Sequence, residues 1–306
     1  MISTRWRELW PRKQKRVTPD ASLISAADTA DTAAIPASVV ERQAGHLQAG
    51  DPQAGVPSSV SVRMLGSFEV GVEARWVRAW GGQRGRSLLQ YLLVRGRPVH
   101  REVLMELLWP GHTYASARNN LNVCLYGLRR AVGSAATRHL VIYLDGCYGL
   151  NEELSWEVDR DRFNAAATSM RGHDRAGRSA DALAAGARAV AFYGGPLFDG
   201  DPLADWFAAE RMALHGMYLE LLERVAELDL QQGDLAGAEH SLQQLLRSGG
   251  CRESAHRLLM RCFASRGQGD LVARQYHRCV ASLSGELDIT PSPQTVDLFH
   301  QLVGAR

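Results

Sequence analysis

Lysine is almost absent from this sequence. Among its 306 residues lysine occurs only at positions 13 and 15, so arginine carries nearly all of the positive charge. The planar guanidinium group suits phosphates and guanine edges, although an arginine bias can equally reflect genome composition. Paired cysteines are also missing, because the five cysteines are scattered, odd in number and never spaced as Cys-x-x-Cys. This pattern excludes a disulfide framework and a zinc site, and it indicates reduced, mostly buried thiols in a cytosolic protein.

No apolar run approaches the length of a membrane span, and no signal-peptide core is found. Catalytic motifs are missing as well, among them His-Glu-x-x-His, Gly-x-Ser-x-Gly and the phosphate-binding Gly-x-x-x-x-Gly-Lys-Ser/Thr. The ten histidines lie singly. We therefore expect a cytoplasmic protein that contacts no membrane, has no catalytic residues, no metal site and no cofactor, and is not an enzyme.

Two local groups of titratable residues have simpler explanations than ligand binding. Asp199, Asp201 and Asp205 are better explained by a solvated helix entrance, with carboxylates at the cap and in the first turn, than by a metal site. His256 and His277 fall within expected helix pairs, where histidine is more often a surface or hydrogen-bonded core residue than a ligand.

Charge is divided unevenly along the chain. The formal net charge is +2, but residues 61–150 hold 12 Arg and 5 acidic residues, whereas residues 151–306 hold 16 Arg and 22 acidic residues. The first region is therefore net +7 and the second net −6. A basic module joined to an acidic one indicates a polyanionic partner for the basic module only.

Residues 1–59 lack a sustained apolar period and are rich in small and polar residues, which predicts a disordered extension. The first part of this extension is basic and contains Trp6 and Trp10. Two interpretations stay open for it: an arm that binds DNA phosphates or the minor groove and, with more weight, a solvated tail.

The segment that follows alternates between short strands and helices. Alternating apolar residues predict strands over 60–64 and 68–72, and a third short strand is expected within 76–80. Apolar periodicity predicts helices over 83–95, 101–109 and 115–132. An Asp145–Gly146 pair between two extended runs predicts a tight hairpin. A helix-turn-helix followed by a hairpin is a winged helix, which we place at residues 60–152.

The helix at 115–132 is the element around which the rest is organised. Its core face collects apolar side chains, namely Ala117, Leu121, Cys124, Leu125, Leu128 and Val132. The opposite face has no Asp or Glu; it carries Ser116, Asn119, Val123, Tyr126 and Arg130, flanked by Arg118, Asn122 and Arg129. Amide and guanidinium groups pair with base edges or bind phosphates, whereas ordinary solvated faces mix charges of both signs. The side chains expected to contact base edges are Asn119, Asn122, Tyr126 and Arg130, with Ser116 and Arg118 at the helix start.

Residues 159–306 are predicted to be entirely helical. The triplet Gly233-Asp234-Leu235 recurs as Gly269-Asp270-Leu271, 36 positions later, and each copy follows one expected helix and opens another. Helix pairs at about this period are typical of tetratricopeptide-like arrays.

Several segments resemble one protein family. Residues 88–110 and 116–132, with Asp-Gly-Cys-Tyr-Gly-Leu at 145–150, resemble the OmpR-type winged helix of SARP-family antibiotic regulatory proteins. Further segments resemble the bacterial transcriptional activation domain that follows it in that family: Gly-Gly-Pro-Leu at 194–197, and residues 206–214, 256–263, 276–283 and 286–295. The sequence departs from the family pattern at Gly127, Cys147, Gly149 and Asp288.

The resemblance implies a mainly α fold: an OmpR-type winged helix with small β-sheets, then an all-α, tetratricopeptide-like activation domain at 159–306. It further implies a sequence-specific transcriptional activator that binds direct repeats of double-stranded DNA near a promoter as a homodimer. Such an activator recruits RNA polymerase and serves a secondary-metabolite gene cluster.

Contacts outside the base-reading face are expected in two places. Arg84 and Arg86, at the start of the first helix, would bind phosphates. Around the hairpin, phosphates or the minor groove would be contacted by Arg129, Arg138 and Tyr143. RNA polymerase would contact an exposed loop through Trp109, His112, Thr113 and Tyr114. One alternative stays open, a helical-repeat scaffold that binds a peptide or small ligand, with DNA binding incidental. A DNA-binding protein would lose affinity steeply as salt rises, and a scaffold would not.

Overall fold

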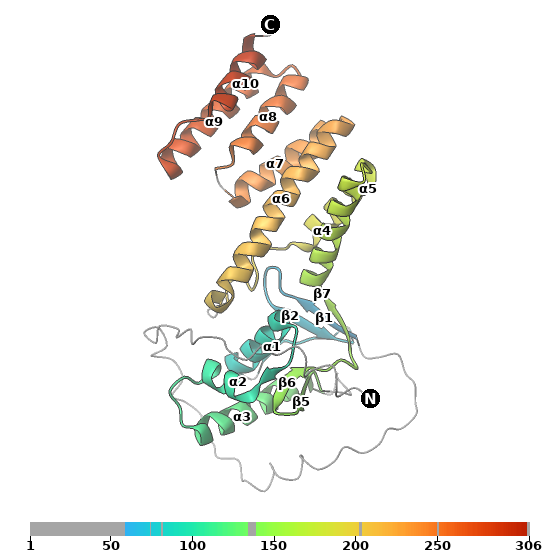
Figure 1. The fold of residues 1–306 in the computed structure, drawn as a ribbon, viewed down its shortest axis with the longest axis vertical. Helices are drawn as coiled ribbons and strands as arrows, with labels where there is room; N and C mark the ends of the chain where they lie inside the picture. Colours follow the sequence, from blue (N-terminus) through green and yellow to red (C-terminus); the bar gives the residue numbers. More distant parts are fainter. Residues whose placement is uncertain are drawn as a thin grey trace. The chain divides into compact units, whose positions relative to one another are not determined.

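The structure is a computed structural model that describes residues 59–73, 75–80, 82–133, 139–201, 204–249 and 251–304, without the side chains of residues 204 and 205 (Figure 1). All of these residues belong to one compact unit. The predicted extension, apart from Ser59, lies outside the described residues, and so does Arg138.

A four-stranded sheet opens the described chain. It contains β1 (Ser59–Arg63), β2 (Glu69–Val72), β3 (Arg75–Trp76) and β7 (Ser155–Val158), in the order β3-β2-β1-β7. β1 and β2 pair antiparallel, with Val60 opposite Val72, because alternate valines of both strands are buried on one core. The third strand is shorter and begins earlier than expected. The sequence did not predict β7, which pairs parallel to β1 with Val60 opposite Trp156.

The winged helix is confirmed. Its elements are α1 (Gln83–Arg95), β4 (Val99–His100), α2 (Arg101–Leu108), α3 (Tyr114–Val132), β5 (Val141–Leu144) and β6 (Cys147–Leu150), and the small sheet has the order β4-β6-β5. Asp145 and Gly146 both have positive φ, 49° and 81°, as a type I′ hairpin turn requires. α1 ends at Gly96, whose left-handed backbone lets its N–H bond the Leu92 carbonyl.

The second half consists of helical hairpins, as predicted. Its helices are α4 (Asp159–Arg175), α5 (Ser179–Phe192), a 3-10 turn (Ala204–Phe207), α6 (Ala208–Gln232), α7 (Leu235–Gly249), α8 (Glu253–Ser265), α9 (Gly269–Leu287) and α10 (Pro293–Gly304). Left-handed Gly233 follows α6 and left-handed Gly267 follows α8, and α7 and α9 begin at Leu235 and Gly269. The structural repeat is therefore 34 residues, not the 36 that the triplet indicated.

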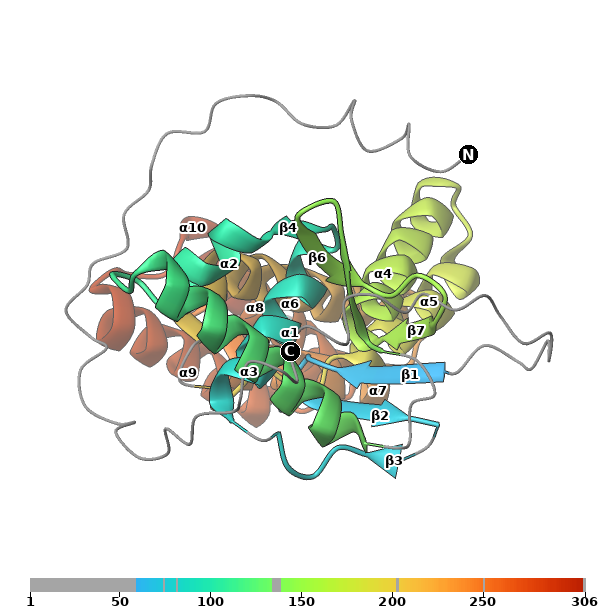
Figure 2. The ribbon, with the colours of Figure 1, turned by 90° about the horizontal axis from the view of Figure 1, so that it is seen from below.

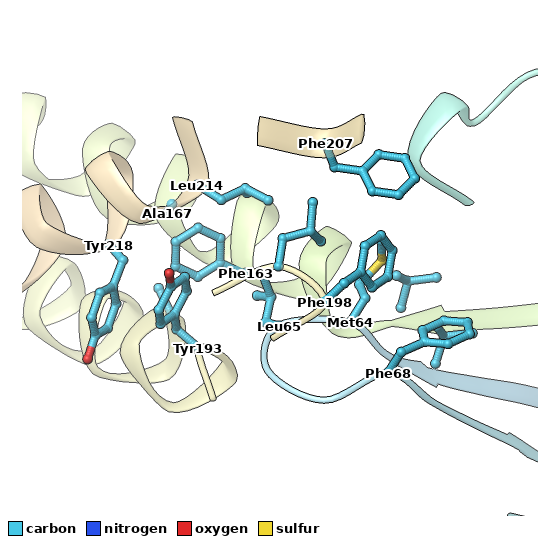
Figure 3. Close-up of a cluster of buried hydrophobic side chains, with 14 of the residues drawn as sticks. Met64, Leu65, Phe68, Phe163, Ala167, Tyr193, Phe198, Phe207, Leu214 and Tyr218 are labelled. Atoms are coloured by element: carbon cyan, nitrogen blue, oxygen red, sulfur yellow. The ribbon is translucent and has the colours of Figure 1, made fainter. Parts of the chain in front are cut away.

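The two halves share one apolar core (Figure 3). The loop after α5 lies against the turn between β1 and β2: Leu65 and Leu197 form a β-bridge, and the Phe198 N–H donates to the Met64 carbonyl at 2.9 Å. A side chain at Gly194 would approach the Leu65 carbonyl oxygen to 2.8 Å, so only glycine permits this contact. Phe198 meets the edge of Phe68, with ring centroids 5.4 Å apart. Such aromatic pairs add about 0.5–1.5 kcal/mol beyond the area they bury.

The interpretation of Asp199, Asp201 and Asp205 as a solvated helix entrance is wrong for Asp201, which is buried. Its side chain is only 1% exposed, and its Oδ2 accepts a hydrogen bond from Gln90 Nε2 at 2.9 Å. Arg86 Nε lies 3.4 Å from the same oxygen. Asp199, in contrast, is exposed as expected. The carboxylate of Asp201 therefore joins the helical half to α1 from inside the core.

Candidate nucleic-acid interface

Residues at both ends of α3 explain where the helix begins and ends. Its N-cap is Thr113, whose hydroxyl accepts from the Ser116 N–H at 3.4 Å. No acidic residue occupies the first turn, while Arg129 and Arg130 occupy the last turn, where cations interact favourably with the helix dipole. Gly133, with φ of 62°, ends the helix.

One face of α3 anchors it to α1 and α2. The buried residues are Ala117, Leu121, Leu125, Leu128 and Val132, as the helical wheel predicted. α1 lies close to α3 at Gly85, where an added Cβ would be 3.5 Å from the Cys124 carbonyl oxygen. Burial raises the pKa of the Cys124 thiol to about 12, against a smaller opposing effect of Arg84. This thiol is therefore a packing group.

The opposite face of α3 is open to solvent (Figure 2, with α3 in front). Its exposed residues are Ser116, Arg118, Asn119, Val123, Tyr126, Arg129 and Arg130, and Asn122 is half-buried beside them. Among the described residues, the amides of Asn119 and Asn122 and the three guanidinium groups have no hydrogen bond or ion pair. No Asp or Glu occurs between Glu106 and Asp145. This face therefore presents free donors in a positive field.

The wing adds a second cationic surface. Tyr143 on β5 is 48% exposed, and its ring lies 4.7 Å from that of Tyr148. Arg101 Nη1 donates to the Tyr143 hydroxyl at 3.3 Å. Burial, with a smaller contribution from Tyr143, raises the pKa of Tyr148, and the positive charges of Arg129, Arg101 and Arg118 oppose that shift. The guanidinium groups of Arg101 on α2 and of Arg118 and Arg129 on α3 thus all lie close enough to Tyr148 of the wing to affect its pKa.

Arg101 is a residue that the sequence argument missed. It lies 42 positions from Tyr143. The pairing of β4 with β6 brings the two together, and the Arg101 N–H donates to the Gly146 carbonyl at 3.0 Å. Its only signal in the sequence is a basic residue at the first position of the second helix, where the helix dipole does not favour a cation.

Arg84 and Arg86 are placed differently from the phosphate contacts expected of them. Arg84 donates to the Leu108 carbonyl, and its guanidinium lies 5.3 Å from the centre of the Trp109 ring. Arg86 lies over Phe68 at 5.6 Å and beside Asp201, inside the contact between the halves. Because α1 packs against other elements, its first-turn cations serve the protein itself. Arg86 thus lies beside a carboxylate of the protein itself, and a role in binding phosphate stays a prediction.

The loop between α2 and α3 is only partly as expected. Trp109, which was expected to be exposed, is only 6% exposed and belongs to the core, since an indole ring beside α1 is better buried than hydrated. His112, Thr113 and Tyr114 are exposed. His112 also lies 3.4 Å from the Ser116 hydroxyl. The exposed part of the loop is thus confined to residues 110–114.

The described parts of the chain show neither a metal cluster nor a membrane span. No group of three His, Cys, Asp or Glu side chains there could hold a metal ion. None of the helices described is long and apolar enough to cross a membrane. All five cysteines are free, and Cys262 and Cys279 are fully buried. His256 is a hydrogen-bonded core residue, as expected.

Comparison with known proteins gives matches over both halves. A family model described as the bacterial transcriptional activator domain matches residues 158–303, from the last residue of β7 into α10. The transcriptional regulatory protein MoaR1 of Mycobacterium bovis is 24% identical over 259 residues, which cover 84% of this chain and 83% of MoaR1. MoaR1 of Mycobacterium tuberculosis matches to the same extent.

A solved structure also resembles this chain, in its fold. Mycobacterium tuberculosis EmbR, in complex with a low-affinity phosphopeptide, superimposes with a TM-score of 0.67 at 21% sequence identity. The match covers 81% of this chain but only 66% of the EmbR chain, so this chain spans just under two thirds of its length. At this identity the likeness shows the fold alone, a winged helix followed by a helical domain, which confirms the predicted fold class.

Proposed function

Because this chain is a transcriptional regulator of the SARP type, we propose that it activates transcription by binding specific DNA sequences through α3. Regulators of this family are non-enzymatic, in agreement with the prediction that the chain is not an enzyme. The observation that carries the proposal is the exposed face of α3, which has free amides and guanidinium groups and no carboxylate. The major groove is wide enough to admit an α-helix with such a face.

The α3 side chains divide into two roles. Asn119, Asn122, Tyr126 and Arg130 face the base edges, where an amide pairs bidentately with adenine and a guanidinium with guanine. Arg118 and Arg129 flank that face and bind phosphates, together with Ser116 near the positive end of the helix dipole. Phosphate contacts fix the register of the helix, and the base contacts then select the sequence.

The wing holds the DNA backbone beside the helix. Tyr143 and Arg101 lie on the wing side of α3, so we add Arg101 to the phosphate-binding set. Arg84 supports the loop between α2 and α3, and it affects DNA binding only through the position of that loop. Winged helices commonly use the hairpin in this way.

The finer parts of the proposal rest on family resemblance. Two protomers bind direct repeats side by side near a promoter, and the exposed loop residues His112, Thr113 and Tyr114 contact RNA polymerase. Trp109 is buried, so it supports that loop from the protein core and does not contact the polymerase itself. The regulated genes belong to a secondary-metabolite cluster.

An Asn122→Ala variant tests the base-reading role. Selecting bound fragments from random DNA with both proteins should show that the variant loses discrimination at one base position, at a cost of about 1–3 kcal/mol. Asn164→Ala, a half-buried asparagine on α4, is the matched control and should select the same operator as the parent chain. A uniform loss of affinity over all sequences would show that Asn122 does not read bases.

Salt dependence separates this proposal from a scaffold with incidental DNA binding. If Arg101, Arg118 and Arg129 each neutralise one phosphate, the plot of log K against log salt should have a slope of about −3 per protomer. Replacing any one of them with Gln should make the slope shallower by about one. Weak binding that ignores base order at low salt would refute the regulator proposal and favour the scaffold.

A further inference from the structure

A cavity of about 490 Å³ opens between α7, α8 and α9, far along the chain from α3. Leu246, Leu259 and Phe263 provide apolar lining, and Arg247 and Arg278 line the same cavity. Its volume is in the range of roughly 300–1,000 Å³ that takes small molecules. The rest of the lining is polar or charged, so the cavity suits a small molecule that carries a charged group as well as an apolar body.

A buried polar pair lies in the cavity wall. His256 and Gln275 are only 5% and 4% exposed, and Gln275 Nε2 lies 2.7 Å from His256 Nδ1. An amide N–H donates, so His256 Nδ1 accepts and the proton of the neutral ring is on Nε2. Burial lowers the pKa of His256, which keeps the ring neutral.

The other ring nitrogen forms no hydrogen bond with a side chain. Among the described residues, none places a side-chain group within hydrogen-bond distance of His256 Nε2, and this nitrogen is not one of the buried polar atoms left without a partner. The wall of this cavity therefore offers an N–H donor to a ligand oxygen.

The charge at the cavity has the opposite sign to that of the domain around it. Residues 151–306 carry a net charge of −6, but the cavity lining has two arginines and one carboxylate. That carboxylate, Glu286, accepts a hydrogen bond from Ser282 at 3.2 Å. Arg247 and Arg278 are exposed and form no ion pair with any described residue. Free cations of this kind favour an anionic ligand.

We propose that this cavity binds a small organic anion. The apolar body of the ligand contacts Leu246, Leu259 and Phe263, and its carboxylate, sulfonate or phosphate group interacts with Arg247, Arg278 and His256 Nε2–H. This would give the helical half a ligand input separate from DNA recognition. Binding is measured without DNA, so its failure would leave the proposed function untouched.

Two fluorescent dyes test the proposal on the full chain. Anilinonaphthalenesulfonate carries an aromatic body and a sulfonate, whereas N-phenylnaphthylamine has the same ring system without the charge. The sulfonate dye should bind one site about tenfold more tightly than the neutral dye. Arg247→Gln and Arg278→Gln should each weaken the sulfonate dye about threefold to tenfold and leave the neutral dye unchanged. Both positions are exposed, so the variants should fold normally.

Arg274→Gln is the matched control, because Arg274 is an exposed arginine of α9 that does not line the cavity. It should bind both dyes as the parent chain does. Equal affinity for the two dyes, or an equal loss in the control, would overturn the proposal. An acidic, leucine-containing peptide that displaces the dye at lower concentrations than naphthalenesulfonate would show that the occupant is a peptide, and it would also overturn the small-anion assignment.

Discussion

The buried carboxylate of Asp201 is one of the polar links between the winged helix and the helical half. In Asp201→Asn the side-chain volume stays the same and the negative charge is lost. Gln90 can still donate to the remaining oxygen, but Arg86, which is 25% exposed, loses the charge that lies 3.4 Å from its Nε. Gln83 Nε2 lies 3.4 Å from the other carboxylate oxygen, so the change leaves one amide without its acceptor as well as a mostly buried guanidinium without a counter-charge.

The size of that effect follows from burial. Removing one partner of a fully buried ion pair costs roughly 3–5 kcal/mol. Arg86 keeps partial access to water and its contact with Phe68, so we expect a smaller loss in the free energy of unfolding, about 2 kcal/mol. For a chain of this size that corresponds to a fall in Tm of about 4–8 °C.

Thermal and urea unfolding of the variants gives the measurement. Asp199→Asn, an exposed aspartate two positions away, is the control and should change stability by less than about 0.5 kcal/mol. Adding Arg86→Met to Asp201→Asn should restore most of the loss, because neither charge is then left alone. The salt slope of DNA binding should not change. Equal stability of Asp201→Asn and Asp199→Asn, or simple additivity of the two substitutions, would refute the reasoning.

Three further outcomes are expected. Arg84→Ala should speed amide hydrogen exchange in loop 110–113, because the guanidinium bonds a carbonyl at the end of α2 and covers Trp109; unchanged exchange would argue against this support. Glu253→Gln should lower Tm at neutral pH. Burial alone would raise the pKa of Glu253, but hydrogen bonds from Ser292 and its neighbours hold it below the usual 4.5. A depressed carboxyl pKa stabilises the fold at neutral pH and this is lost as pH falls through that pKa, so the Tm difference between variant and parent should vanish in acid. Cys124 should resist alkylation at neutral pH in the folded chain and react after denaturation, as peptide mass spectrometry can show.

Local patterns in the sequence were sufficient to predict most of the helices and strands. α1 has the predicted bounds because leucines recur at helical spacing and Gly96 can adopt the left-handed conformation that ends the helix. The wing hairpin follows from Asp145–Gly146, where both residues take positive φ. The exposed and buried faces of α3 likewise follow from its periodicity alone. These features depend on residues that are neighbours in the sequence.

Features that depend on distant partners were not predictable. β7 is a short segment whose strand conformation comes from pairing with β1, almost a hundred residues earlier in the chain. Asp201 lies in an acidic loop, and the partners of its buried carboxylate are distant in the sequence, among them Gln90, 111 positions away. Similarly, the sequence places Arg86 correctly on the first turn of α1 but cannot show that this turn faces the other half.

The route by which the chain leaves the wing has a mechanical consequence. After β6 the backbone passes Asn151, whose amide donates to the His139 carbonyl, and then runs through β7 straight into α4. No residue separates Val158, the end of the strand, from Asp159, the start of the helix. The junction of β7 and α4 therefore has no linker, so in the proposed DNA complex the angle at which the wing meets the double helix would also orient the helical half. Neighbouring protomers would then tolerate only a narrow range of operator spacings, since a half-turn insertion would rotate one activation domain away from the other.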